Sequence, residues 1–138
     1  MREVKSMGRL LACLVVLVLF TCGATRVFGA DLRITEMAVT TKIVRNNPID
    51  SVKRISSTSV KALYCFTRLV NPSQQDTAIR HVWYRNGAVV GEQELKVKGE
   101  KWRTWSKRPI DRESVGKWRV EALDAGGKLL KAVEFKIN

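Results

Sequence analysis

The sequence predicts an all-β fold: an immunoglobulin-like antiparallel β-sandwich of about seven strands, after an N-terminal signal segment. Beyond residue 30, apolar residues alternate with polar ones or form short runs, as in strands. Turn residues interrupt these runs at short intervals, and no convincing helix pattern occurs between them. A tryptophan in a middle strand, Trp83, also fits such a sandwich. A small barrel is the alternative architecture.

The first 30 residues have the layout of a secretory signal peptide. Three basic residues precede an apolar run over residues 10–20, after which the chain becomes small and polar. This run is too short to span a membrane, which takes roughly 20 residues. We therefore expect cleavage of residues 1–30 and a single β-sandwich domain over residues 31–138, periplasmic or secreted from a bacterium. Membrane attachment would need an uncleaved signal or a lipid anchor.

The predicted mature domain is strongly basic. Removing residues 1–30 takes away four of the 25 Lys and Arg and one of the 13 Asp and Glu, which leaves a net charge of +9. Such a charge fits an anionic glycan, a membrane surface, an acidic protein or a nucleic acid as partner. Export makes nucleic acid the least favoured of these partners.

The first two predicted strands are separated by turn residues and a polar stretch. The first covers residues 32–44 and stops at the Asn-Asn-Pro turn of residues 46–48. A polar stretch over residues 50–59 leads to the second strand, residues 60–70, which is apolar on both faces as a central strand can be. Its faces carry Leu63, Cys65 and Leu69 on one side, and Tyr64 and Phe66 on the other.

Two hairpins complete the predicted sheet pattern. The strand over residues 79–85 puts Ile79, His81 and Trp83 on one face, and Asn86-Gly87 after it is a strong hairpin signal. Leu95 and Val97 then alternate with charged residues, and the stretch KWRTWSKR follows at residues 101–108. The closing hairpin joins alternating strands around residues 118–122 and 133–137 through a turn at residues 124–127.

The stretch KWRTWSKR provides the candidate binding residues. Because side chains alternate between faces, residues 102 and 105 must lie on opposite faces of an unbulged strand. If Trp102 points inward, Arg103 and Trp105 share the outer face, where a guanidinium stacks favourably on an indole. The alternative is that Arg103 only shields Trp105 from water. We expect most of the four tryptophans of the mature domain to lie in the core. The candidate binding surface consists of Arg103, Trp105, Lys107, Arg108 and His81.

No catalytic, metal or cofactor site is predicted. His81 is the only histidine, and no cluster of Cys or His would supply further metal ligands. Cys65 is the only cysteine of the predicted mature domain, which suits a buried structural residue better than a nucleophile. A Cys65-His81 dyad is conceivable, but no third group is indicated. Carboxylates fall mostly at turns or on wet faces, and the glycines form no phosphate-binding pattern.

Five motifs of the sequence, taken in order, resemble a bacterial family known as domain of unknown function 2914. They are LYCFTRLV (63–70), IRHVWY (79–84), WRTWSKR (102–108), GKWRVEALDAGGKLL (116–130) and EFKI (134–137). RNNP (45–48) is similar to a short segment before the family's first motif, whereas Lys107-Arg108 departs from its usual pattern. The resemblance implies a β domain that follows a signal sequence or membrane helix, and it implies no activity.

These observations favour a non-catalytic exported module that binds an anionic partner of the cell envelope, either a glycan or a protein. Two alternatives come from other classes of protein. One is a periplasmic enzyme that uses Cys65 or His81. The other is a structural subunit that assembles through its sheet edges, and the oligomeric state stays open at this point.

Overall fold

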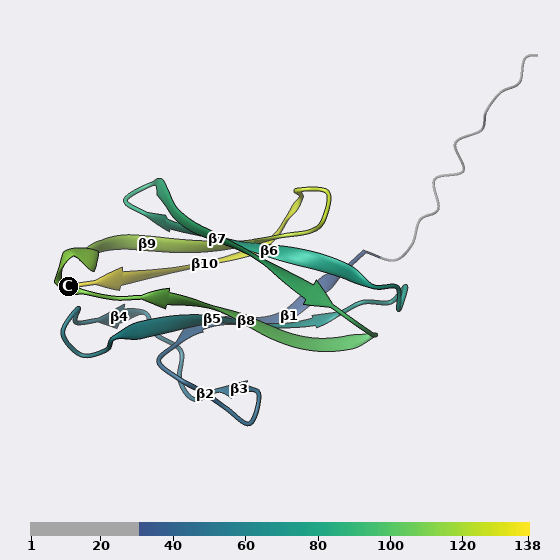
Figure 1. The fold of residues 1–138 in the computed structure, drawn as a ribbon, viewed down its shortest axis with the longest axis horizontal. Coiled ribbons are helices and arrows are strands. Elements are labelled where there is room, and N and C mark those ends of the chain that lie inside the picture. The colour runs from purple at the N-terminus through teal and green to yellow at the C-terminus, as the bar shows by residue number, and fades with distance from the viewer. Residues whose placement is uncertain (1–30) are drawn as a thin grey trace, which may run out of the picture.

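The computed structural model describes residues 31–138, in which two sheets pack face to face (Figure 1). The smaller sheet has the order β1-β5-β8, and the larger has the order β4-β10-β9-β6-β7. Every pair of neighbouring strands is antiparallel except β4 with β10. The expected signal peptide lies outside the described residues.

The smaller sheet consists of β1 (Arg33–Thr40), β5 (Ala62–Val70) and β8 (Lys101–Pro109). The larger consists of β4 (Arg54–Ile55), β6 (Thr77–Arg85), β7 (Ala88–Val97), β9 (Gly116–Leu123) and β10 (Leu129–Ile137).

Seven of these strands contain eight or more residues, which confirms the predicted all-β sandwich of about seven strands. The one helical element is the short 3-10 helix η1 (Arg112–Ser114), within the part of the chain that the structure describes. No helix of residues 31–138 is long and apolar enough to cross a membrane.

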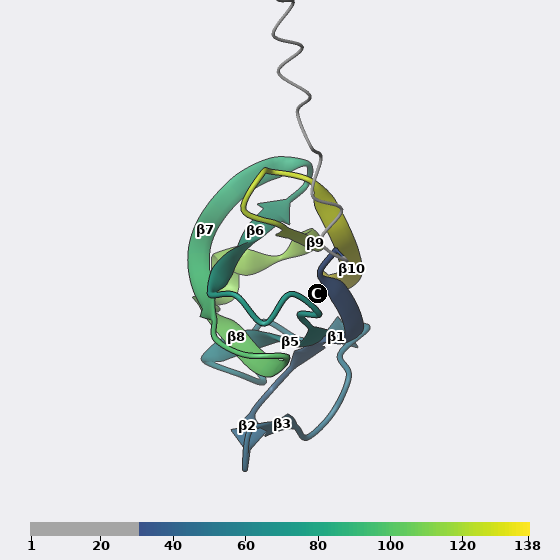
Figure 2. The ribbon, with the colours of Figure 1, turned by 90° about the vertical axis from the view of Figure 1, so that its right-hand side faces the viewer.

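A small hairpin projects from the outer face of the smaller sheet (Figures 1 and 2). It pairs β2 (Ile43–Val44) with β3 (Asn47–Pro48), so the single strand expected over residues 32–44 is wrong beyond Thr40. The cause is Asp50, whose carboxylate accepts hydrogen bonds from the hydroxyls of Thr40 and Thr41 at 2.6 Å and from the Thr41 amide at 2.8 Å. Burial opposes ionisation of Asp50, but these hydrogen bonds lower its pKa overall.

The core between the sheets follows the predicted alternation. Trp83 of β6, Trp118 of β9 and Phe135 of β10 form an aromatic cluster, with ring centroids 5.7 to 6.3 Å apart. Edge-to-face and offset arrangements of this kind add to the free energy gained by burial. The two tryptophans are only 2% and 4% exposed, whereas Trp102 and Trp105 are half-buried. Trp102 packs against a second core cluster, so three of the four tryptophans contribute to the core, as expected.

A buried polar network crosses the core and connects the two sheets. The ring of His81 on β6 makes hydrogen bonds to Thr67 of β5 (Nε2, 2.8 Å) and to Ser106 of β8 (Nδ1, 2.7 Å). The indole Nε1 of Trp83 donates to the same Ser106 hydroxyl at 3.0 Å. All four side chains are buried, so each polar atom that water would otherwise solvate has a partner inside the protein.

The predicted hairpin between β6 and β7 is also confirmed. Asn86 and Gly87 have φ angles of 50° and 82°, as a two-residue turn of this kind requires. The Asn86 side chain accepts a hydrogen bond from the Lys117 amide at 3.0 Å. A Cβ on Gly116, which has a φ of 146°, would lie 2.7 Å from the Asn86 Oδ1 atom, so only glycine fits beside this turn.

The His81 network should make the domain sensitive to acid. Burial lowers the pKa of His81 from 6.5 to about 4, so the unfolded chain binds more protons than the folded domain between these values. The free energy of unfolding should therefore fall by about 3 kcal/mol as the pH drops from about 6.5 to about 4. Urea unfolding at about pH 7 and about pH 4.5 measures this loss.

The variant His81→Gln is the matched control, because it keeps a polar side chain but does not titrate in this range. It should be less stable than wild type near pH 7, yet lose less stability on acidification. The carboxylates are common to both proteins, so their titration cancels in the comparison. Equal losses in the two proteins would show that His81 is not the acid-sensitive group.

A candidate binding surface on the smaller sheet

Strand β8 presents its aromatic and basic side chains on two different faces. Its nine residues pair with β5 without any shift in register, so no bulge disturbs the alternation. Trp102 packs against buried core residues and Ser106 lies in the core network. The residues between them, Arg103 and Trp105, therefore lie on the outer face together with Lys107. This confirms the prediction that the two tryptophans of KWRTWSKR lie on opposite faces.

Outward side chains of β5 complete this outer face. Phe66 lies opposite Trp105, Tyr64 opposite Lys107, and Arg68 opposite Arg103 in the register of the two strands. The Arg68 guanidinium carbon lies 5.9 Å from the Phe66 ring centroid, and the Lys107 Nζ lies 6.0 Å from that of Tyr64. Both distances are within the range of cation–π attraction, so aromatic rings help to place these cations.

A groove of about 710 Å³ runs between this face and the turn of the β2–β3 hairpin. Residues 101–105 of β8 form one part of its lining and Asn46 of the hairpin turn another. Among residues 31–138, Lys101 and Arg103 form no ion pair. The groove is therefore basic and partly aromatic. Its lining residues are Thr35, Asn46, Arg68, Leu69, Val70, Lys101, Trp102, Arg103 and Trp105.

Arg68 holds the hairpin against the sheet and also lines the groove. Its Nη2 atom donates to Asn47 of β3 at 3.1 Å, and its Nη1 atom forms an ion pair with Glu36 at 3.3 Å. The buried Nε atom has no hydrogen-bond partner among the described residues. The contacts with Asn47 and Glu36 position Arg68 as a cationic wall of the groove, with part of its charge balanced by Glu36.

Sequence reasoning missed two components of this groove. Arg68 follows Phe66 by two residues and so had to share its face, which the alternation of β5 would have shown. Asn46 reaches the groove only because Asp50 folds the hairpin back, and no periodic pattern indicates that. Arg45 and Asn46 adopt φ angles of 50° and 61°, which are uncommon for residues other than glycine.

Two of the predicted binding residues do not lie on this surface. His81 is fully buried, because both of its ring nitrogens are used in the core network. Arg108 follows Lys107 directly and therefore points to the inner face of β8. There its Nη1 atom would lie 2.7 Å from a Cβ on Gly91 of β7, so it bridges toward the other sheet. The structure thus brings together Arg103, Trp105 and Lys107 only.

The residues of the conceivable dyad lie in the core. Burial raises the pKa of the Cys65 thiol far above its usual range, so the thiolate that acts as nucleophile is strongly disfavoured. His81 uses both ring nitrogens for Thr67 and Ser106, and neither contacts the thiol. Among residues 31–138, no three His, Cys, Asp or Glu side chains gather in a way that would hold a metal ion.

With this fold and groove, the described chain is an immunoglobulin-like β-sandwich. A solved immunoglobulin-like protein from Pseudomonas aeruginosa is similar, with a TM-score of 0.56, 14% identity, and coverage of 80% of this chain and 98% of that one. The alkylpurine DNA glycosylase AlkC from Pseudomonas fluorescens, solved bound to DNA containing an abasic site analog, gives a TM-score of 0.52 at 14% identity. That match covers 78% of this chain but only 30% of AlkC, and such low identity shows the fold alone.

Residues 76–137 match the model of the family described as Protein of unknown function (DUF2914). The match confirms the resemblance to that family for the motifs within residues 76–137. The match spans β6 to β10, and the segments RNNP and LYCFTRLV lie before it. No curated protein matches the chain.

The position of Trp105 can be tested by fluorescence. Iodide should quench a red-shifted part of the wild-type emission, and Trp105→Phe should remove much of that part because Trp105 is half-buried on the outer face. Trp118→Phe is the control, since Trp118 is 4% exposed and should contribute little to the quenched emission. An accessible fraction that persists in Trp105→Phe and falls in Trp118→Phe would contradict this assignment.

Proposed function

We propose that this domain is a non-catalytic, exported binding module that binds an anionic partner of the bacterial cell envelope through the groove on the smaller sheet. The observation that carries the proposal is the position of Lys101, Arg103 and Trp105 along one groove wall, with Arg68 fixed beside them. An anionic glycan is the favoured partner, and an acidic protein segment is the alternative.

The chemistry of the groove supports a glycan that carries carboxylates. A half-buried indole offers an apolar plate on which a sugar ring can pack. Guanidinium groups match the planar, two-oxygen geometry of a carboxylate, which favours Arg103 as its donor. Because the cations of β8 have no acidic partner among residues 31–138, a ligand would not have to break ion pairs to reach them.

The burial of Cys65 and His81, the two candidate catalytic residues, supports a non-catalytic role. The thiol of Cys65 and the ring of His81 are both buried, so a substrate has no path to either. If the alternative enzyme existed, Cys65→Ala would abolish turnover of an envelope substrate while the domain stayed folded. Unchanged processing in that variant would remove the enzyme hypothesis.

Binding to purified peptidoglycan, which carries carboxylates, tests the proposed function. Wild-type protein should co-sediment with it, and the bound fraction should fall as NaCl is raised from about 0.05 to about 0.5 M because exposed charges are screened. The double variant Lys101→Gln, Arg103→Gln should bind about tenfold more weakly, which corresponds to about 1.4 kcal/mol. Trp105→Ala should also weaken binding but keep the dependence on salt.

The matched control is Lys96→Gln, Lys131→Gln, which removes the same charge from exposed positions on β7 and β10, outside the groove. It should bind like wild type at a given salt concentration. Binding that resists high salt, or that falls equally in both double variants, would overturn the groove as the site. A neutral polysaccharide that competed as well as an acidic one would argue against an anionic partner.

A further inference from the structure

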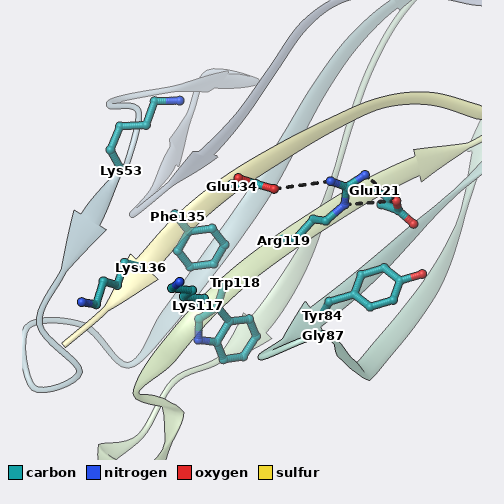
Figure 3. A pocket seen from close by; sticks show the side chains of 10 residues that line it. All are labelled: Lys53, Tyr84, Gly87, Lys117, Trp118, Arg119, Glu121, Glu134, Phe135 and Lys136. Carbon is teal, nitrogen blue, oxygen red and sulfur yellow. Dashed lines mark hydrogen bonds and ion pairs between the residues drawn. The ribbon is translucent and has the colours of Figure 1, made fainter.

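The outer face of the larger sheet carries a second concentration of positive charge. A hollow of about 690 Å³ lies over β9 and β10, bounded by Tyr84 and the β6–β7 turn on one side and by Lys53 on the other (Figure 3). It is on the sheet opposite to the groove described above and shares no residue with it. Three of its lining residues, Lys53, Lys117 and Lys136, are here called the lysine cluster.

The register of β9 and β10 places unlike charges opposite each other at one position and like charges opposite each other at a neighbouring position. Arg119 lies directly opposite Glu134, which is a favourable pair, whereas Lys117 lies directly opposite Lys136. Like charges at opposed positions of an antiparallel pair destabilise a sheet. Lys136 is also opposite Arg54 of β4, and its amide donates to the Lys53 carbonyl at 3.0 Å. The fold thus gathers cations from three strands at one end of this face.

Nearby carboxylates do not neutralise the lysine cluster. Glu121 and Glu134 both pair with Arg119, at 2.8 and 3.4 Å, as the dashed lines of Figure 3 show. Within residues 31–138, none of the three lysines forms an ion pair. The cluster therefore has positive charge available, while the charge of Arg119 beside it is already compensated.

Hydrogen bonds between Asn86 and the backbone of Lys117 fix the chain at this site. Asn86 of the β6–β7 turn accepts from the Lys117 amide and donates its own amide to the Lys117 carbonyl at 2.7 Å. The turn can come this close only because residue 116 is glycine. Lys117 is thus held at a set position opposite Lys136, at the cost of repulsion between the two charges. Both side chains are exposed, so a ligand in the hollow can reach their charges.

We propose that the lysine cluster binds a phosphate group. A phosphate carries nearly two negative charges near neutral pH and three acceptor oxygens, which suits several compact ammonium groups. It would offset the repulsion between Lys117 and Lys136, so binding and stability are coupled at this site. The phosphate comes either from a free anion or from the headgroup of an acidic lipid, and both sources share this chemistry.

The first experiment is a titration of the domain with inorganic phosphate at constant ionic strength, followed by amide NMR. Saturable shifts are expected for residues 116–118 and 134–137, and the melting temperature should rise with phosphate. The double variant Lys117→Gln, Lys136→Gln should bind phosphate at least about tenfold more weakly. It should also melt at a higher temperature than wild type without phosphate, because the opposed charges are gone.

The control Lys96→Gln, Lys131→Gln removes two exposed lysines from the same sheet without touching the cluster. It should bind phosphate like wild type. Equal weakening in both double variants, or no saturable shifts in wild type, would overturn the proposal. If the cluster variant folds poorly, Lys117→Glu replaces it, since that change creates an opposed pair of unlike charge and should still abolish phosphate binding.

Vesicles separate the two sources of phosphate. Co-sedimentation with phosphatidylglycerol vesicles but not with phosphatidylcholine vesicles, lost in the cluster variant, would assign the site to lipid headgroups. Phosphate binding without vesicle binding would assign it to a free anion. The control Lys96→Gln, Lys131→Gln should behave like wild type in both assays, because it removes the same charge outside both the lysine cluster and the groove.

Discussion

The hydrogen-bond network of Thr67, His81, Ser106 and Trp83 is the constraint on which the binding surface depends. It connects a strand of the larger sheet to two strands of the smaller one inside a dry core. Because Ser106 must face inward to take part, the register of β8 is fixed, and a slip by one residue would bury Arg103 and expose the serine. Such a slip would leave several polar groups of the core unpaired, at a cost of about 1 to 3 kcal/mol each. The hydrogen bonds of the inward-facing Ser106 therefore determine which side chains of β8 face solvent.

Much of the fold could be predicted from alternation alone, because an inner face of a sandwich needs an apolar residue at every second position. Trp118 and Phe135 were assigned correctly for this reason. His81 was correctly placed on the face of Ile79 and Trp83, but its inclusion in the binding surface was wrong, since its hydrogen-bond partners come from two other strands. The hairpin of β2 and β3 also escaped prediction, because it depends on three hydrogen bonds to Asp50 and not on any period. Long-range polar contacts of this kind produce no periodic pattern in a sequence.

The positive charges on the two outer faces have different neighbours. On the smaller sheet, cations sit beside aromatic rings, as Arg68 does over Phe66, so part of their charge is balanced by a ring face. On the larger sheet, Arg119 is balanced by two carboxylates while the neighbouring lysines are not. A surface selected only for solubility would spread such charges and intersperse both signs. Cations without an acidic partner among residues 31–138 therefore lie on both faces, at Lys101 and Arg103 in the groove and in the lysine cluster.

The similarity to two solved proteins concerns the fold alone. The same sandwich makes up nearly all of an immunoglobulin-like protein and less than a third of AlkC, at 14% identity in both cases. A fold shared at such low identity preserves the positions of strands but not the chemistry of their outer side chains. In the described domain, the inner faces carry the aromatic cluster and the His81 network, whose side chains are at most 5% exposed. The groove and the lysine cluster lie on the outer faces instead, where their side chains are open to a ligand.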